Sequence, residues 1–348
     1  MTRLLSYSEL KTAMDCLARW DFAYGGRLAG SALRSRRIAP RLSEGRAFGA
    51  AAAEWHAQSS SLLANWLAHQ AAVESLEADF DEMRAAGVPV TAGELSEAHS
   101  RISAVLDHYM ATAEPMPLTR LEDELDVPLP SRGGRRGSNR YRFTGRIDGF
   151  APDELGHQWI VEFKLRGQLM PAWLIQLSAQ LRWYSWALGR QQGDQFPVGV
   201  LVEERLNGFP LPARILKSGQ PSKDQAQHTT GELYRQACAE TGAEVDELVA
   251  EMFDRRQWQQ RTPIVFRPGE LEDAAAELVG AARLIAALDA GEIVPIRNAS
   301  RAHCSGCQFR EICPAPSDRL FVESLFERIP AKRDRVNQQR EAASVNTT

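Results

Sequence analysis

The chain has 348 residues, of which 44% are hydrophobic and 25% charged, so it can bury a large core as one elaborated domain or as two. Its formal net charge of −4 excludes a protein whose overall field holds nucleic acid, although a local basic groove stays compatible with it. No run reaches the roughly 18 apolar residues of a membrane span, and the first ten residues lack the apolar core of a signal peptide. We therefore expect a cytoplasmic protein with no membrane partner.

Residues 1–120 are expected to form a mostly helical first part. From Ser6 to about Ala113 the residues Ala, Leu, Glu and Arg are frequent, and apolar residues recur at helical spacing, as in LLANWLAHQAAVESLEADFDEM. Cys16 belongs to the first of these helices, within the stretch SYSELKTAMDCLARW.

Residues 121–215 are expected to form the core of an α/β domain. Three short strand-like runs are separated by Gly, Pro and Ser: LDVPLP, RYRFTGRIDGF and HQWIVEFKL. A helical stretch follows from about Pro171 to Gly189, and the Val and Leu of FPVGVLVEER then indicate a buried strand. This order of strands and helix predicts an α/β fold with a mixed central sheet.

Residues 216–330 return to helical composition around 225–257 and 270–290 and end in a stretch rich in cysteine. The tail, residues 331–348, is polar with few large apolar side chains, so we expect it to be disordered. We expect the parts before the tail to belong to one elaborated domain.

Charged residues lie on one face of the expected strand WIVEFKL. Alternation places Glu162 and Lys164 on one face and Val161 and Phe163 on the other, and Asp148 of the preceding run GRIDGF could lie opposite the charged face. Two carboxylates a few ångströms apart repel each other unless a cation neutralises them, and hard carboxylates favour Mg²⁺ or Mn²⁺. Such an ion can lower the pKa of bound water, while Lys164 positions the nucleophile or stabilises negative charge.

A salt bridge on an edge strand, with Asp148 in an Asp-Gly turn, would explain the same residues without any chemistry. The context favours the chemical explanation: the pattern GRIDGF followed by WIVEFKL resembles the PD-(D/E)XK nuclease superfamily, and in particular its RecB family. In that family a Gly-x-(Ile/Val)-Asp strand precedes an (Asp/Glu)-x-Lys strand. The resemblance implies a restriction-endonuclease-like core and metal-dependent hydrolysis of phosphodiesters, with Asp148 and Glu162 as metal ligands and Lys164 as a catalytic residue.

The helix after the lysine strand adds a second match to that family. Gln180 and Tyr184 lie four residues apart in QLSAQLRWYSWAL, hence on one helical face, and Gln-x-x-x-Tyr after the lysine strand is a RecB-family signature. The resemblance implies that both residues contact DNA or order the active site. An amphipathic core helix is the alternative explanation of the same stretch.

The resemblance also implies a further metal ligand, often His, on an N-terminal helix after a glycine. Residues 44–58 correspond to that helix, but Ala53 occupies the position four residues after Gly49. Glu54 is the nearest residue that can coordinate a hard ion and His56 is the runner-up, although each is equally compatible with an exposed helical position. Without either residue the second metal would be weakly held and activity would be low or absent.

The five cysteines are expected to be reduced thiols or metal ligands. The string CSGCQFREICP supplies Cys304, Cys307 and Cys313, which with Cys16 make four ligands for a 4Fe-4S cluster or a structural Zn²⁺. Cys238 is left over as a buried apolar residue. One early cysteine with a C-terminal cysteine cluster resembles the 4Fe-4S nucleases, among them the AddB-type and CRISPR-adaptation nucleases. Such a cluster would staple the helical N-terminal and C-terminal parts together.

An arginine-rich loop, SRGGRRGSNRYR, precedes the Asp148 strand and contains Arg135, Arg136 and Arg140. A solvated hairpin loop accounts for its position, and a loop that binds DNA phosphates beside the cleft accounts for it equally well.

These patterns together predict a Mg²⁺- or Mn²⁺-dependent deoxyribonuclease that acts on single strands or free ends, as an exonuclease in recombination, repair or mobile-element processing. No phosphate loop of the G-x-x-x-x-G-K-(S/T) type occurs, so unwinding would come from a helicase or recombination partner. The alternatives are a catalytically weak DNA-binding or assembly subunit and a zinc-stapled module that binds protein. The nuclease is favoured because Asp148, Glu162 and Lys164 are all present.

Overall fold

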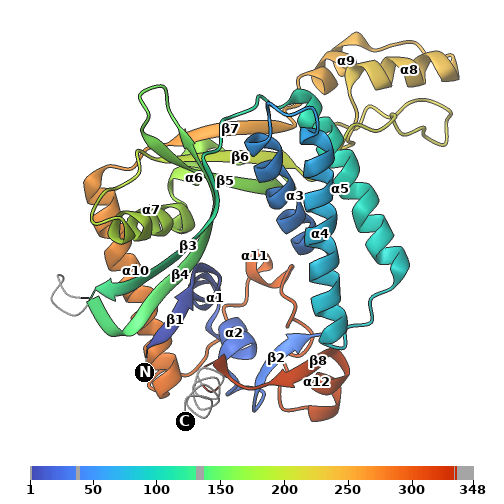
Figure 1. Ribbon diagram of the computed structural model, residues 1–348. Helices are drawn as coiled ribbons and strands as arrows, with labels where there is room; N and C mark the ends of the chain where they lie inside the picture. Colours follow the sequence, from blue (N-terminus) through green and yellow to red (C-terminus); the bar gives the residue numbers. More distant parts are fainter. Residues whose placement is uncertain (1, 37–39, 131–136, 333, 335–348) are drawn as a thin grey trace.

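The computed structural model describes residues 2–36, 40–130, 137–332 and 334. Within these residues, six strands form one mixed sheet with helices on both faces (Figure 1). The strands follow the spatial order β1-β4-β5-β6-β7, and β3 pairs with β4. Their bounds are Arg3–Ser6 for β1, Arg120–Pro130 for β3, Gly137–Pro152 for β4, Gln158–Arg166 for β5, Val200–Leu206 for β6 and Gln259–Ile264 for β7. The expected α/β fold with a mixed sheet is confirmed.

Three long helices of the N-terminal half cover one face of the sheet (Figure 1). They are α3 (Pro40–Ala57), α4 (Ala64–Ala85) and α5 (Ala92–Thr112). Alanines such as Ala47 and Ala51 are fully buried on α3, which suits both helix formation and a close approach of the helix to its neighbours. Val161 and Phe163 of β5 belong to the same apolar cluster, so the face of β5 that carries them packs against these helices.

The other face of the sheet is covered by helices that follow β1, β5 and β7 in the chain. They are α1 (Tyr7–Asp15), α6 (Ala172–Gln176), α7 (Ala179–Gln191) and α10 (Pro268–Ala290). Ile160 of β5 and Leu181 of α7 are among the side chains buried in this second core. Glu162 and Lys164 therefore point to the side of the sheet on which α7 lies.

The two ends of the chain are joined by protein contacts. Strand β2 (Ala32–Ser35) pairs antiparallel with β8 (Phe326–Ile329) as a second sheet. Glu9 is fully buried between Arg3 and Lys332, so one carboxylate links the first strand and helix to a segment more than 300 residues later. Three short helices lie in this end region: α2 (Leu17–Trp20), α11 (Arg301–Cys304) and α12 (Arg319–Leu325). Residues 333 and 335–348 of the expected disordered tail lie outside the described residues.

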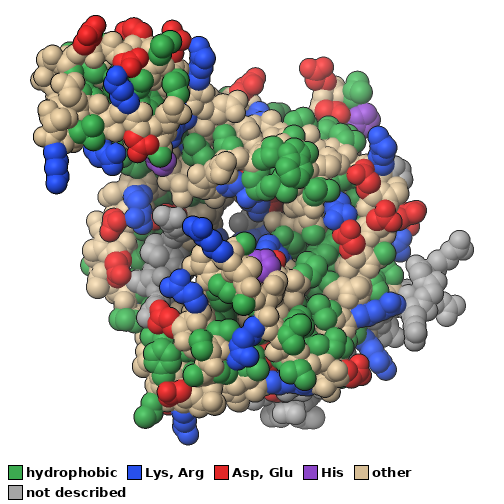
Figure 2. Space-filling model, turned by 180° about the vertical axis from the view of Figure 1, so that it is seen from behind, with side chains coloured by type: hydrophobic (Ala, Val, Ile, Leu, Met, Phe, Trp, Pro, Cys, Tyr) green, Lys and Arg blue, Asp and Glu red, His purple; other side chains and the backbone are tan. Residues whose placement is uncertain are grey.

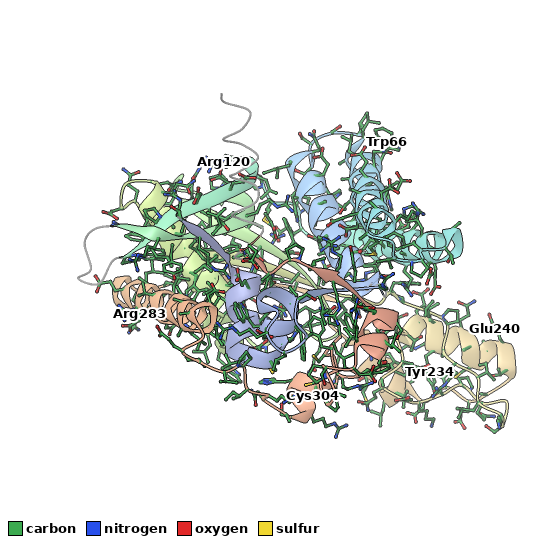
Figure 3. The ribbon with its side chains drawn as sticks, turned by 90° about the horizontal axis from the view of Figure 1, so that it is seen from below. Trp66, Arg120, Tyr234, Glu240, Arg283 and Cys304 are labelled. Carbon is green, nitrogen blue, oxygen red and sulfur yellow. The ribbon has the colours of Figure 1, made fainter. Side chains whose placement is uncertain are left out.

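Two helices between β6 and β7 form a separate lobe with a small core of its own (Figures 1 and 3). They are α8 (Gly231–Thr241) and α9 (Glu247–Asp254). Cys238 is fully buried in that core, as expected for an apolar residue. None of the helices in the described part of the chain is long and apolar enough to cross a membrane.

A chain of buried polar groups connects the helices of the first face to the sheet. The backbone N–H of Met116 donates to Nδ1 of His56 at 3.1 Å, so the imidazole proton is on Nε2, which lies 2.7 Å from the Tyr109 hydroxyl. The Tyr109 hydroxyl donates to Glu203 at 3.3 Å, and Arg261 donates to the second Glu203 oxygen at 2.7 Å. Burial, and then the charge of Arg261, lower the pKa of His56 to about 3, so this imidazole is neutral at pH 7.

We expect Tyr109→Phe to lower the free energy of unfolding by about 1–3 kcal/mol, because it leaves the His56 N–H and a Glu203 oxygen buried without their partner. Urea denaturation at pH 7 measures this. Tyr141→Phe is the matched control, since its ring is half-buried and water can replace the lost partner. Equal losses in the two variants would contradict the role of the buried chain.

Candidate active site where strand β4 changes partner

Strand β4 changes its neighbour within the motif GRID. Its residues 141–144 pair with β1, and its residues 149–152 pair with β5. Between these two ladders, residues 145–147 pair only with β3, which lies along the other edge of β4. The sheet therefore divides at Asp148. Backbone groups of β5 beyond this point have no partner on β4 and can form hydrogen bonds with side chains.

Asp148 occupies the point of division and bonds to β5 through its side chain. The ladder between β4 and β5 ends at the pair Gly149–Val161, which brings Asp148 next to Glu162. An Asp148 carboxylate oxygen accepts a hydrogen bond from the backbone N–H of Phe163 at 2.9 Å. The aspartate is fixed in this position because it replaces a partner that the strand ladder would otherwise supply.

Glu162 and Lys164 form a single hydrogen-bonded group with the helix above them. Lys164 Nζ pairs with one Glu162 oxygen and lies 3.2 Å from the side-chain oxygen of Gln180. The Gln180 amide donates to the same Glu162 oxygen at 2.8 Å. Gln180 of α7 thereby orients both charged groups, and one of the three donors of the lysine stays available for a substrate or water.

Tyr184 lies one turn after Gln180 and packs directly on β4. A side chain at Gly145 would come within 2.9 Å of the Tyr184 ring, so the glycine of GRID is the residue that makes room for it. Burial, and then the charge of Glu162, raise the pKa of Tyr184 well above its usual range. The two sequence signatures, Gly-Arg-Ile-Asp and Gln-x-x-x-Tyr, are thus parts of one packed unit.

The two carboxylates share one neighbouring cation, Lys164, which pairs with a single Glu162 oxygen. The second Glu162 oxygen is buried and has no hydrogen-bond partner among the described residues, and the Glu162 side chain is only 3% exposed. Burial, and then the charge of Glu162, raise the pKa of Asp148 to about 7, against the opposing effect of Lys164. An unpartnered carboxylate oxygen beside a second carboxylate fits a hard divalent cation such as Mg²⁺ or Mn²⁺.

Two further polar features of this face had no clear signal in the sequence. Tyr7 of α1 packs edge-on against Trp183 and Tyr184, with ring centroids 5.8 and 6.5 Å apart, and burial, Asp15 and Glu162 raise its pKa to about 12. Arg166 of β5 forms an ion pair with Glu204, which is fully buried on β6 in register with Lys164. Ser6 caps the start of α1, but such a cap predicts only the helix and not the approach of Tyr7 to the site.

Glu54 and His56, the expected third ligand and its runner-up, lie on α3. Within the described residues, no group of three or more His, Cys, Asp or Glu side chains is arranged to hold a metal ion, so Glu54 does not complete a set with Asp148 and Glu162. Both ring nitrogens of His56 have protein partners, and its ring stacks on Phe163, on the opposite face of β5 from Glu162.

Three of the four cysteines proposed as ligands share one apolar cluster. Cys16, Cys307 and Cys313 all pack against residues that include Phe22 and Phe309. Burial raises the pKa of Cys307, and Cys16 and Cys313 add to this effect. Cys304 ends α11, at the lower edge of the view in Figure 3. In the described part of the chain, these thiols do not form a group of three or more ligands arranged to hold a metal ion.

The arginine-rich loop is described only in part. Arg135 and Arg136 lie outside the described residues, and Arg140 is an exposed residue of β4.

We expect the metal-free protein to lose stability as the pH rises from about 4 to 7. The folded-state pKa of Asp148 is raised, so the folded protein binds more protons than the unfolded chain in this range, with a slope of at most about 1.4 kcal/mol per pH unit. Asp148→Asn should remove this slope and be more stable than the wild type at pH 8 in EDTA, whereas Asp273→Asn, an exposed control, should behave like the wild type. Urea denaturation from pH 4 to 8 measures the slope, and an unchanged slope in Asp148→Asn would count against the raised pKa.

Comparisons with known proteins bear on the whole chain. The family model of the PD-(D/E)XK nuclease superfamily matches residues 4–314. None of the curated proteins matches the chain. A solved structure titled "Crystal structure of SSO0001" is 13% identical to this chain, covers 70% of this chain and 81% of its own chain, and has a TM-score of 0.27. The family match, which spans nearly the whole sequence, shows that this chain belongs to the PD-(D/E)XK nuclease superfamily.

Proposed function

We propose that this chain is a deoxyribonuclease that uses Mg²⁺ or Mn²⁺ to hydrolyse phosphodiester bonds. The observation that carries the proposal is the carboxylate pair at the division of the sheet: Asp148 and Glu162 adjoin, one Glu162 oxygen is buried with no hydrogen-bond partner among the described residues, and Lys164 lies beside it. Asp148 and Glu162 would hold the ion. Water and phosphate oxygens would fill its other positions, since Mg²⁺ usually keeps several such ligands.

The residues of the site divide the work of hydrolysis. A bound divalent ion would lower the pKa of the water that it holds and would neutralise negative charge on the phosphate. Lys164 would orient the attacking water or stabilise the negative charge that develops on phosphorus-bound oxygens, because one of its donors is not used by Glu162 or Gln180. Gln180 holds Lys164 and Glu162 in one geometry, and Tyr184 fixes the helix that carries Gln180 against Gly145.

A single strand or a free end is the substrate that the surroundings favour. In the chain, helix α6 lies between the lysine strand and the Gln180 helix, and Trp173 of α6 and Leu177, the residue that caps its C-terminus, have 66% and 61% of their surface exposed. Ile175 of the same helix is buried. Exposed aromatic and apolar groups can stack on unpaired bases, which a duplex keeps inside its own stack. Strand separation would then require a helicase or recombination partner.

The four cysteines would hold a 4Fe-4S cluster of the kind found in RecB- and AddB-like iron-sulfur nucleases, with a structural Zn²⁺ as the alternative. Support comes from the shared apolar cluster of Cys16, Cys307 and Cys313 and from the backbone N–H of Asn298, which donates to the Cys16 sulfur at 3.4 Å. Hydrogen bonds to sulfur are a usual feature of iron-sulfur sites. The cluster would reinforce the contacts that already join the two ends of the chain.

A second candidate function follows from the missing third ligand. Because Glu54 does not complete a three-ligand set within the described residues, a weakly active DNA-binding or assembly subunit is the alternative to an efficient nuclease. The two candidates differ in one observable property, which is the rate of DNA cleavage with a divalent ion.

We expect the wild type to degrade end-labelled single-stranded DNA with Mg²⁺ or Mn²⁺ but not with EDTA, and Lys164→Ala to cut about 100-fold more slowly or not at all. Lys217→Ala, which removes an exposed lysine elsewhere, is the matched control and should cut normally. Circular single strands in a parallel reaction separate the modes of action: an exonuclease leaves them intact.

Cleavage by Lys164→Ala at the wild-type rate would refute the assignment of this site. A wild type that binds DNA and does not cut it with either ion would favour the weakly active subunit. Faster cleavage of duplex than of single-stranded DNA would contradict the proposed substrate.

We expect the protein purified without oxygen to be brown and to contain about four iron atoms per chain. Alanine variants of Cys16, Cys304, Cys307 and Cys313 should each lose the iron, whereas Cys238→Ala, at a buried cysteine of the α8–α9 lobe, should keep it. About one zinc per chain in place of iron would show that the cysteines hold a structural Zn²⁺ instead of the cluster. Full iron content in Cys16→Ala would show that Cys16 is not a ligand.

A further inference from the structure

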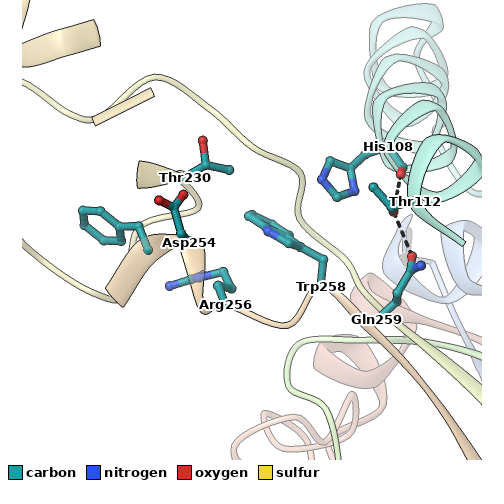
Figure 4. Close-up of a pocket in the computed structure, with 8 residues that line it drawn as sticks. His108, Thr112, Thr230, Asp254, Arg256, Trp258 and Gln259 are labelled. Atoms are coloured by element: carbon teal, nitrogen blue, oxygen red, sulfur yellow. Dashed lines mark hydrogen bonds between the residues drawn. The ribbon is translucent and has the colours of Figure 1, made fainter. Parts of the chain in front are cut away.

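A cavity of about 380 Å³ lies where the α8–α9 lobe meets the body of the protein (Figure 4). Its wall includes His108 and Thr112 of α5, Arg256 after the end of α9, and Trp258 and Gln259 at the start of β7. The volume is at the lower end of the range of small-ligand sites, about 300–1,000 Å³. The cavity is distinct from the candidate active site, because none of its lining residues belongs to β4, β5 or α7.

A buried arginine lies directly behind this wall. Arg205 of β6 is fully buried and donates to the backbone oxygen of Trp258 at 2.8 Å, and its guanidinium lies 5.5 Å from the centre of the Trp258 ring. It also contacts Nδ1 of His108 at 3.3 Å, while its Nε has no hydrogen-bond partner among the described residues. No described carboxylate forms an ion pair with Arg205, so its charge is left uncompensated in a site where compensation is expected.

A second cation adds to the positive field of the cavity. Arg256 lines the wall and lies 5.5 Å from the Trp258 ring centre. Burial, and then the charge of Arg205, lower the pKa of His108. The carboxylate in the wall, Asp254, is already engaged by the backbone N–H of Gly231 at 2.7 Å and by Arg235 at 3.2 Å, so it compensates neither Arg205 nor Arg256.

We propose that this cavity binds the phosphate group of a nucleotide. The phosphate would lie against Arg256 and the His108 ring of the α5 wall, in the field of Arg205, and so supply the negative partner that no described carboxylate gives Arg205 or Arg256. The indole of Trp258 and the ring of Phe253 give the cavity apolar walls as well, which suit the sugar or base of a nucleotide better than a bare inorganic anion. The nucleotide is either free in solution or part of a nucleic-acid strand that passes over the lobe.

Isothermal titration of the full chain in EDTA, where cleavage is blocked, tests the proposal with four probes: deoxyadenosine 5′-monophosphate, deoxyadenosine, inorganic phosphate and a twelve-residue oligodeoxyadenylate. We expect the monophosphate or the oligonucleotide to bind and deoxyadenosine not to bind. Arg256→Ala should weaken binding about tenfold or more, as expected for the loss of a charge-assisted hydrogen bond. Arg255→Ala removes the same charge one residue away, outside this cavity, and should bind like the wild type.

Gln259→Glu guards against an Arg256 variant that fails to fold. The substitution preserves the shape of the side chain and an oxygen next to the Thr112 hydroxyl, which lies 3.3 Å away (Figure 4), but it adds a negative charge to the cavity wall. It should abolish phosphate binding at an unchanged melting temperature.

The probes separate the two sources of the phosphate. Binding of the monophosphate that depends on Arg256 assigns the cavity to a free nucleotide, and an effect confined to the oligonucleotide assigns it to a strand. The proposal is overturned if neither probe binds, if inorganic phosphate and deoxyadenosine bind as well as the monophosphate, or if Gln259→Glu and Arg256→Ala weaken binding no more than Arg255→Ala does. Because cleavage is not the readout, these outcomes are independent of whether the carboxylate pair is catalytic.

Discussion

The change of partner by strand β4 is the constraint on which the candidate site depends. Strand β4 pairs with β1 over residues 141–144 and with β5 over residues 149–152, so the sheet must divide between these ladders. The division frees the N–H of Phe163, and Asp148 takes it as a side-chain partner. Two carboxylates are thereby brought together in a buried setting although they repel each other, so the arrangement is not a source of stability, and the proposed cation would relieve this repulsion.

The surrounding residues maintain this unfavourable arrangement. Gln180 bonds both Glu162 and Lys164, and Tyr184 holds the same helix against the bare backbone of Gly145. On the opposite face, Phe163 is packed against His56, whose two nitrogens have protein partners. The neighbouring elements thus fix both faces of β5. They can hold Asp148, Glu162 and Lys164 in an arrangement that is locally unfavourable, because the two apolar cores stabilise the rest of the fold.

Local sequence patterns predicted strand β5 and helix α7 of the site. They did not predict the strands that pair with the central strands, or the side chains that this pairing brings to the site. The alternation in WIVEFKL was enough to place Glu162 and Lys164 on one face, because the period of a strand is a local property. Strand β1 has four residues and β7 contains mainly polar ones, so each is a strand by virtue of its partner, β4 or β6, far away in the sequence. Tyr7 reaches the site only through the pairing of β1, and no local signal located it. The cavity behind Trp258 likewise depends on where the inserted helices dock.

Electron paramagnetic resonance of added Mn²⁺ measures whether Asp148 and Glu162 together bind a divalent ion. The free-ion signal during titration gives the number of bound ions and their affinity without any need for cleavage. We expect about one tightly bound Mn²⁺ per chain in the wild type and in the exposed control Glu272→Gln, and its loss in both Glu162→Gln and Asp148→Asn. Binding of Mn²⁺ by Glu162→Gln with wild-type affinity would contradict this expectation.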